Sequence, residues 1–179
     1  MKLFKLKLHN FRSFGDGEKD ILFDDLTAFI GNNSAGKTTA MCALNCIFSE
    51  NPNDRVVKRS DFHLPKEKSP DEMLKQDMYI EAIFTFEELK NEQGQKYAIP
   101  EFFESLVVDV PNGVPYLRIR LIATWESSNT TEGAIDSKIV YVTCPEEQEI
   151  TEASTVIAHR KELDRIRVIY IPAVRQPEK

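Results

Sequence analysis

The sequence predicts an α/β fold in which a strand–loop–helix unit is followed by an antiparallel β-sheet. The first observation is a glycine-rich loop, GNNSAGKT at residues 31–38, which lies between an apolar run and a helical apolar pattern. The second is a pair of segments, residues 78–86 and 117–125, in which alternate residues are apolar. The connections between these strands lack a crossover helix, so we expect the strands to run antiparallel.

The N-terminal third predicts three strands before the loop. Residues 4–8 alternate apolar and polar side chains, as in a half-buried strand, and residues 10–17 form a polar turn with two glycines. Residues 21–23 suggest a short second strand. Residues 26–30 are almost continuously apolar, which predicts a strand buried on both faces.

A helix is expected directly after the glycine-rich loop. Its apolar residues recur at helical spacing and fall on one face: Ala40, Ala43, Leu44, Ile47 and Phe48. The sequence Asn51-Pro52-Asn53 ends this helix.

The remainder of the chain predicts a shorter strand at 139–142, a helix over residues 147–163 and a fully apolar strand at 168–171, which Pro172 ends. We divide the chain into a core at 1–50, a β-rich lobe with insertions at 51–145, and a helix and core strand at 146–179. A parallel sheet that begins at 26–30 needs more strands than follow here. We therefore expect the chain to be the N-terminal part of a longer protein.

Composition excludes several classes of protein. The chain has 179 residues, a net charge of −6 and 41% hydrophobic residues, which is globular and not disordered. It contains no apolar run of the roughly 20 residues that a bilayer span needs, and no signal peptide is evident. Three cysteines without a disulfide-like pattern suit a cytoplasmic protein.

The loop satisfies the G-x-x-x-x-G-K-[ST] pattern of a phosphate-binding P-loop. Its glycines let successive backbone N–H groups point at phosphate oxygens, and the following helix N-terminus favours negative charge. In this motif Lys37 reaches the β- and γ-phosphates, and the hydroxyl of Thr38 coordinates Mg²⁺. The sequence therefore predicts ATP and Mg²⁺ as cofactors.

The surroundings of the loop resemble a particular group of ATPases. The first strand ends in Asn10-Phe11-Arg12-Ser13-Phe14, and this pattern together with the P-loop resembles the ABC-type heads of SMC and RecF proteins. The sequences Ser60-Asp61-Phe62-His63 and 169–175 (IYIPAVR) extend the resemblance to the OLD (overcoming lysogenisation defect) family of ATP-dependent endonucleases.

This resemblance implies a set of site residues and a fold, the N-terminal lobe of an ABC-type P-loop ATPase with an added antiparallel sheet. Lys37 and Gln176 are the expected catalytic residues, and Thr38 and Gln176 the expected Mg²⁺ ligands. The expected nucleotide-binding residues are Arg12, Asn32, Asn33, Ser34, Ala35, Gly36, Lys37, Thr38 and Thr39. The other motifs of such a head, and a Toprim nuclease domain, are expected beyond residue 179.

The resemblance implies an ATP-hydrolysing head whose nucleotide state regulates DNA cleavage by the Toprim domain, with a role in anti-phage defence. Implied partners are DNA, a second copy of the chain in a homodimer or higher homo-oligomer, and a partner protein or nucleic acid of a defence system; no membrane is implied. The alternative is a RecF- or SMC-like DNA clamp without nuclease activity. A small nucleotide kinase is disfavoured, because such enzymes usually begin with the P-loop strand.

Other conspicuous residues have simpler interpretations. Cys42 and Cys46 are expected to be packing residues on the helix, and Trp125 is expected in the core. Arg118 and Arg120 share one face of a strand, which is interpreted as a solvated face, with DNA contact as the alternative.

Overall fold

The computed structural model describes residues 1–32, 36–65, 67, 72–86, 99–109, 113–128 and 132–171. Seven described strands form one sheet in the order β2-β1-β3-β5-β6-β7, and β4 pairs with β5 outside this path. Every pairing is antiparallel, as predicted for the middle strands β3, β5 and β6, and the parallel sheet expected to begin at 26–30 is not present among the described residues. The strands are β1 (Lys2–His9), β2 (Lys19–Leu22), β3 (Lys75–Thr85), β4 (Val107–Val108), β5 (Tyr116–Glu126), β6 (Ala134–Val142) and β7 (Thr155–Ile157).

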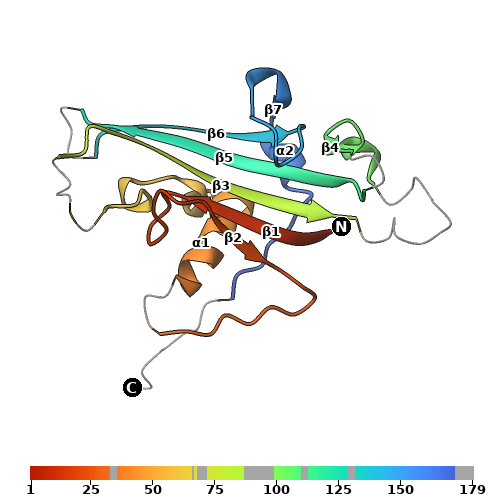
Figure 1. Ribbon diagram of the computed structural model, residues 1–179, viewed down its shortest axis with the longest axis horizontal. Helices are drawn as coiled ribbons and strands as arrows, with labels where there is room; N and C mark the ends of the chain where they lie inside the picture. The colour runs from red at the N-terminus through yellow and green to blue at the C-terminus, as the bar shows by residue number, and fades with distance from the viewer. Residues whose placement is uncertain are drawn as a thin grey trace.

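Helix α1 (Lys37–Phe48) lies against one face of this sheet (Figure 1). The short helices are η1 (Pro52–Arg55), η2 (Arg59–Asp61), η6 (Glu101–Phe103), η7 (Glu152–Ser154) and α2 (Arg160–Leu163). Among the described helices, none is long and apolar enough to cross a membrane.

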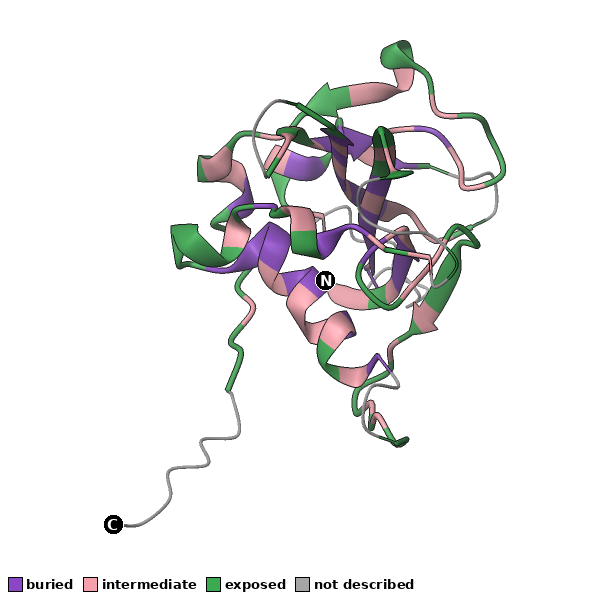
Figure 2. Ribbon diagram, turned by 90° about the vertical axis from the view of Figure 1, so that its left-hand side faces the viewer, coloured by how far each residue is buried: buried purple, intermediate pink, exposed green. Residues whose placement is uncertain are grey.

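The core forms where α1 meets the sheet, because alternate residues of β1, β3 and β5 point toward the apolar face of the helix. Buried residues gather at this contact (Figure 2). Phe48 at the end of α1 meets Phe84 of β3 edge to face, with ring centroids 5.6 Å apart. The predicted helix and its apolar face are therefore confirmed.

Two arginines complete the C-terminal end of α1. Arg55 donates to the carbonyl oxygen of Ser49 at 2.6 Å, and Arg160 donates to those of Ile47 at 2.8 Å and Ser49 at 3.1 Å. Cationic donors suit the negative end of the helix dipole and satisfy carbonyls that have no intrahelical partner. These contacts fix α1 to the segments that follow it, including α2.

Two of the predicted strands do not form. Residues 26–30 are irregular and pair with none of the described strands, and Leu26 and Ile30 are 89% and 94% exposed. Residues 168–171 likewise form no strand, and Ile171 is 84% exposed. Without a hydrogen-bonded neighbour, an apolar run forms no strand, whatever its side chains.

The predicted helix over 147–163 is instead a turn, η7, strand β7 and the single turn α2. β-Branched residues recur in this stretch, at Thr151, Thr155, Val156 and Ile157, and they favour extended backbone. Val156 pairs with Tyr141, which extends the sheet by one strand.

The sheet face opposite α1 carries a paired ionic cluster. Glu81 on β3 is fully buried and binds Arg118 at 2.8 Å, and it also binds Arg120 on the same neighbouring strand. Arg118 donates its other guanidinium nitrogen to the carbonyl oxygen of Cys144. The expected solvated arginine face is therefore wrong, because Arg118 is 1% exposed and neutralised within the fold.

Candidate functional site

The P-loop lies at the N-terminal end of α1, as the motif requires. Its last glycine, Gly36, is buried and adopts φ +87°, a left-handed conformation that glycine accommodates without steric cost. The first helical hydrogen bond runs from the N–H of Ala40 to the carbonyl oxygen of Gly36 at 3.1 Å. The N–H groups of residues 37–39 therefore belong to the helix turn that has no intrahelical acceptors.

Lys37 reaches back across the loop. Its ammonium donates to the carbonyl oxygens of Gly31 at 2.6 Å and Asn32 at 2.7 Å. The first turn of α1 contains no acidic residue. An ammonium inside the loop, free helix N–H groups and no competing carboxylate in that turn form a donor set that suits a polyphosphate.

The hydroxyl-bearing residues of the motif differ in environment. Thr38 is exposed, whereas Thr39 is partly buried and its Oγ1 accepts a hydrogen bond from Ser13 at 3.2 Å. The exposed hydroxyl of Thr38 suits the predicted Mg²⁺ ligand. Among the residues that the structure describes, no group of three or more His, Cys, Asp or Glu side chains could hold a metal ion by itself.

A turn at residues 10–15, which we call the arginine turn, packs against the end of the P-loop and the first turn of α1. Asn10 and Arg12 both have positive φ angles, 51° and 49°. Phe14 packs directly under Gly36, since a Cβ atom on that glycine would lie 2.9 Å from the ring. With the Ser13–Thr39 hydrogen bond, this contact brings the two sequence motifs together.

Arg12 is held by a buried carboxylate. Its Nε and Nη2 both lie 2.8 Å from Oδ1 of Asp61, whose side chain is 4% exposed. Burial lowers the pKa of Arg12, but the hydrogen bond and charge of Asp61 outweigh burial and raise it. Arg12 therefore remains a cation, and it lines a polar cavity of about 220 Å³ with Cys42 and Asn45 of α1.

Asp61 belongs to a stretch that we call the η2 segment, residues 58–64. The N–H of Arg12 donates to the carbonyl oxygen of Asp61, and the N–H of His63 donates to that of Asn10, each at 2.8 Å. Nδ1 of His63 donates to the carbonyl oxygen of Arg12 at 2.7 Å. The sequence pointed to the Asp-Phe motif only as a family mark, and the structure shows that it fixes the arginine turn.

The two helix cysteines have the packing role expected of them. Cys46 is 3% exposed, and burial raises the pKa of its thiol to about 12. Cys42 and Cys46 both line the cavity next to Arg12. A buried thiol with so high a pKa is almost fully protonated at neutral pH and is therefore a poor nucleophile.

The structure brings five of the predicted nucleotide-binding positions into one region: Arg12, Gly36, Lys37, Thr38 and Thr39. Asn32 adjoins them through its carbonyl oxygen, which accepts from Lys37. The predicted site residues Asn33, Ser34, Ala35 and Gln176 lie outside the described residues.

Comparison with known proteins defines the class. Residues 1–170 match the AAA ATPase domain family, so the chain belongs to that family and contains a domain that binds and hydrolyses ATP. One similar solved structure comes from work on ATP-driven dimerization and DNA-stimulated activation of SMC ATPases. It has a TM-score of 0.55 and 17% sequence identity, with 93% of this chain and 77% of that chain covered. At this identity the similarity shows a shared fold. No curated protein matches the sequence.

Proposed function

We propose that this chain is the ATP-binding and hydrolysing head of an OLD-like DNA endonuclease in the cytoplasm. Nucleotide state in the head would regulate DNA cleavage by a Toprim domain elsewhere in the protein, with a role in anti-phage defence. The observation that carries the proposal is the contact between Arg12 and Asp61. It joins the Asn-Phe-Arg motif, which resembles SMC and RecF heads, to the Asp-Phe motif, which extends the resemblance to the OLD family, directly beside the P-loop helix.

The residues of this chain have distinct parts in such a reaction. The backbone of the loop and the first turn of α1 cradle the phosphates. Lys37 exchanges its two carbonyl partners for phosphate oxygens and neutralises charge on them. Among the described residues, the hydroxyl of Thr38 would be a ligand for Mg²⁺, and the ion would supply positive charge that stabilises the phosphates.

A second candidate is a DNA-clamping ATPase without nuclease activity. The structural similarity to an SMC ATPase favours it, because that protein was studied for ATP-driven dimerization and DNA-stimulated activation. In both candidates ATP joins two copies of the chain in a homodimer or higher homo-oligomer, and DNA or a defence-system partner is engaged by the whole protein.

The experiment that separates the two compares nuclease activity with DNA retention. The full reading frame is incubated with linear and circular DNA, with and without ATP and Mg²⁺, alongside a Lys37→Ala variant. ATP-dependent cleavage that changes in the variant supports the nuclease head. Retention of intact circular DNA, lost on linearisation, supports the clamp, and neither activity would contradict both.

A further inference from the structure

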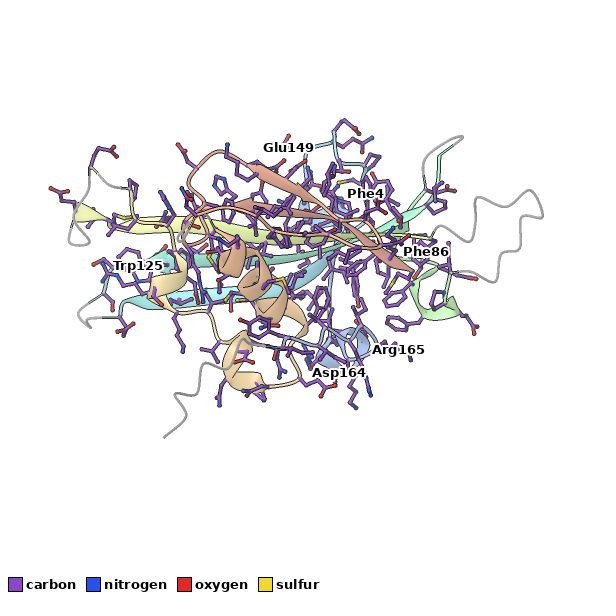
Figure 3. All side chains as sticks on the ribbon, turned by 90° about the horizontal axis from the view of Figure 1, so that it is seen from below. Phe4, Phe86, Trp125, Glu149, Asp164 and Arg165 are labelled. Carbon is purple, nitrogen blue, oxygen red and sulfur yellow. The ribbon has the colours of Figure 1, made fainter. Side chains whose placement is uncertain are left out.

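A second cavity, separate from the P-loop, lies between the η2 segment and the end of the sheet where β3 begins and β5 ends. Its volume is about 540 Å³, which falls within the range of small-molecule sites. Trp125 lies at this end of the sheet, far from Phe86 at the other end (Figure 3). No described P-loop residue lines this cavity.

Much of the cavity wall is apolar and partly aromatic. Phe62, Leu64, Met73 and Trp125 line it, and Trp125 is only 2% exposed. The indole N–H of Trp125 already donates to the carbonyl oxygen of Glu132 at 2.8 Å, so the buried ring closes the cavity beneath Arg59 and adds no free polar group to it. A wall of this kind suits a flat ring system.

Cations border the same cavity. The guanidinium of Arg59 stacks on Trp125, 4.3 Å from the ring centroid, and Lys58 lies next to it in the chain. Glu132 is the one carboxylate among the described lining residues. A guanidinium that lies over an indole presents a planar face on which a base can stack, and together with the ammonium of Lys58 it adds positive charge that favours a phosphate.

We propose that this cavity binds an unpaired nucleotide, with the base against the apolar wall and the phosphate at Arg59 and Lys58. The nucleotide is either free or part of a single-stranded nucleic acid, since both present this chemistry. Exposed bases that stack on aromatic or arginine planes, next to cations that take the phosphate, are how proteins commonly bind single strands.

The cavity is connected to the ATP site by one continuous set of contacts. Gln76 of β3 donates to the carbonyl oxygen of His63 at 2.7 Å, which fixes the η2 segment to the sheet. Asp61, in the same segment, holds Arg12, and the arginine turn supports Gly36 and Thr39. A ligand that changes the position of the η2 segment therefore changes the support of the P-loop. This second part rests on the proposed ATPase function.

Trp125 is the single tryptophan of the chain, which gives a direct binding signal. We would titrate the Lys37→Ala variant, without Mg²⁺, with thymidine monophosphate, a 5′-phosphorylated oligothymidylate and its unphosphorylated form. We expect saturable quenching of intrinsic fluorescence by at least one phosphorylated probe. The free and the strand-borne nucleotide are distinguished by which of the two phosphorylated probes binds.

Matched variants locate the binding. Leu64→Arg fills the cavity from a residue that is 44% exposed, whereas Leu74→Arg alters a nearby residue that is 75% exposed and does not line it. We expect Leu64→Arg to weaken binding at least about tenfold, within the range for the loss of one stacked base, and Leu74→Arg to leave it unchanged. Thermal unfolding confirms that both variants fold.

Absence of saturable quenching by either phosphorylated probe overturns the proposal, as does equal loss of binding in the two leucine variants. Because this titration needs no ATP hydrolysis, its result is independent of the proposed ATPase function. Coupling is tested next on the chain with Lys37 intact. A bound probe should change the ATPase rate, and Asp61→Asn should remove that change while quenching persists. If the rate is unaffected although the probe binds, the coupling is wrong and the site stands.

Discussion

The ring of Phe14 lies directly beneath Gly36, so close that a methyl group on the glycine would be 2.9 Å from Cζ of the ring. This relationship explains why the second glycine of the loop has no substitute here. Its backbone is left-handed, with φ +87°, and the space on its Cβ side is already filled. The P-loop motif and the Asn-Phe-Arg motif thus meet at this contact and at the Ser13–Thr39 hydrogen bond.

We expect Gly36→Ala to lower the free energy of unfolding and to weaken nucleotide binding. The left-handed conformation costs an alanine roughly 1–2 kcal/mol, and the clash with Phe14 adds to this. Thermal unfolding and nucleotide titration measure the two effects. Gly17→Ala is the control, because its Cβ would meet only the end of Lys19, at 3.9 Å. Similar results for the two glycines would contradict the Phe14 contact.

Lys37→Ala should abolish ATP hydrolysis and weaken nucleotide binding strongly without unfolding the protein. The ammonium contacts two loop carbonyls and lies outside the core, so its loss removes charge from the phosphate site and little packing. Phosphate release and nucleotide titration in the full reading frame measure this. Lys161→Ala, an exposed lysine on α2, is the control. Unchanged turnover in Lys37→Ala would mean that the site assignment is wrong.

Thr38→Ala should reduce Mg²⁺-dependent hydrolysis more than nucleotide binding. The hydroxyl is exposed at the second position of α1 and serves the metal, while the backbone donors that hold the phosphates remain. Titrating ATP with and without Mg²⁺ tests this division. If the variant loses the same affinity under both conditions, the hydroxyl acts on the nucleotide and not through Mg²⁺.

Removal of the buried carboxylate in the ionic cluster should be strongly destabilising. Glu81→Gln leaves Arg118 buried without its countercharge, and the loss of one partner of such a pair costs about 3–5 kcal/mol. Chemical denaturation measures the change. Glu126→Gln on β5 is the control, because its partner Lys75 and Glu126 itself are more than half exposed and their 2.8 Å ion pair contributes little. Equal stabilities would show that the cluster is not desolvated.

Acid should destabilise the fold through Glu146. Burial raises the pKa of this carboxyl, but hydrogen bonds from Lys7 and Lys5 outweigh burial and hold the pKa below its ordinary value of 4.5. A carboxyl with a lowered pKa in the folded state stabilises the fold above its unfolded pKa, and this stability is lost as pH falls through the folded pKa. Unfolding experiments from pH 7 to below 4.5 should show the loss, and Glu146→Gln should flatten it. An unchanged slope in that variant would contradict the assignment.

The sequence predicts the elements whose partners lie within the described chain. Strands β3 and β5 follow from strict alternation, and they pair with each other along their whole length, from Lys75 with Glu126 to Thr85 with Tyr116. Helix α1 follows from its apolar face and from the P-loop before it. In each case one local pattern specifies both the element and the side that it buries.

The segments at 26–30 and 168–171 show where this reasoning fails. An apolar run predicts burial, but a strand also needs a neighbour for its backbone groups, and the sequence of one segment does not report the neighbour. Phe29 and Val168 still pack on the core, while the residues that directly follow them, Ile30 and Ile169, are exposed. In both segments one side chain contacts the core, but the backbone pairs with no described strand.

The arginines of β5 were misinterpreted for a related reason. A charge every second residue is compatible with a solvated face or with a face of paired charges. The signal that separates these cases was present as Glu81, an acid between the apolar residues Ile80 and Ala82 of β3 and directly opposite Arg120. Opposite charges on two strands that pair indicate a cluster more strongly than either strand does alone.

The strand order also determines when the nucleotide site can form during synthesis. β1 pairs with β3 through Leu8 with Ile80 and Leu6 with Ala82. The first strand therefore cannot complete its pairing until these residues, which follow the P-loop by more than 40 positions, have been translated. The surface that supports α1 is complete only when β5, ending at Glu126, has left the ribosome. Until then, Ala43, Leu44 and Ile47 lack part of the core against which they pack, which exposes an apolar helix face to chaperones. The P-loop is thus translated early, but it can bind nucleotide only late, after the strands that support α1 have paired.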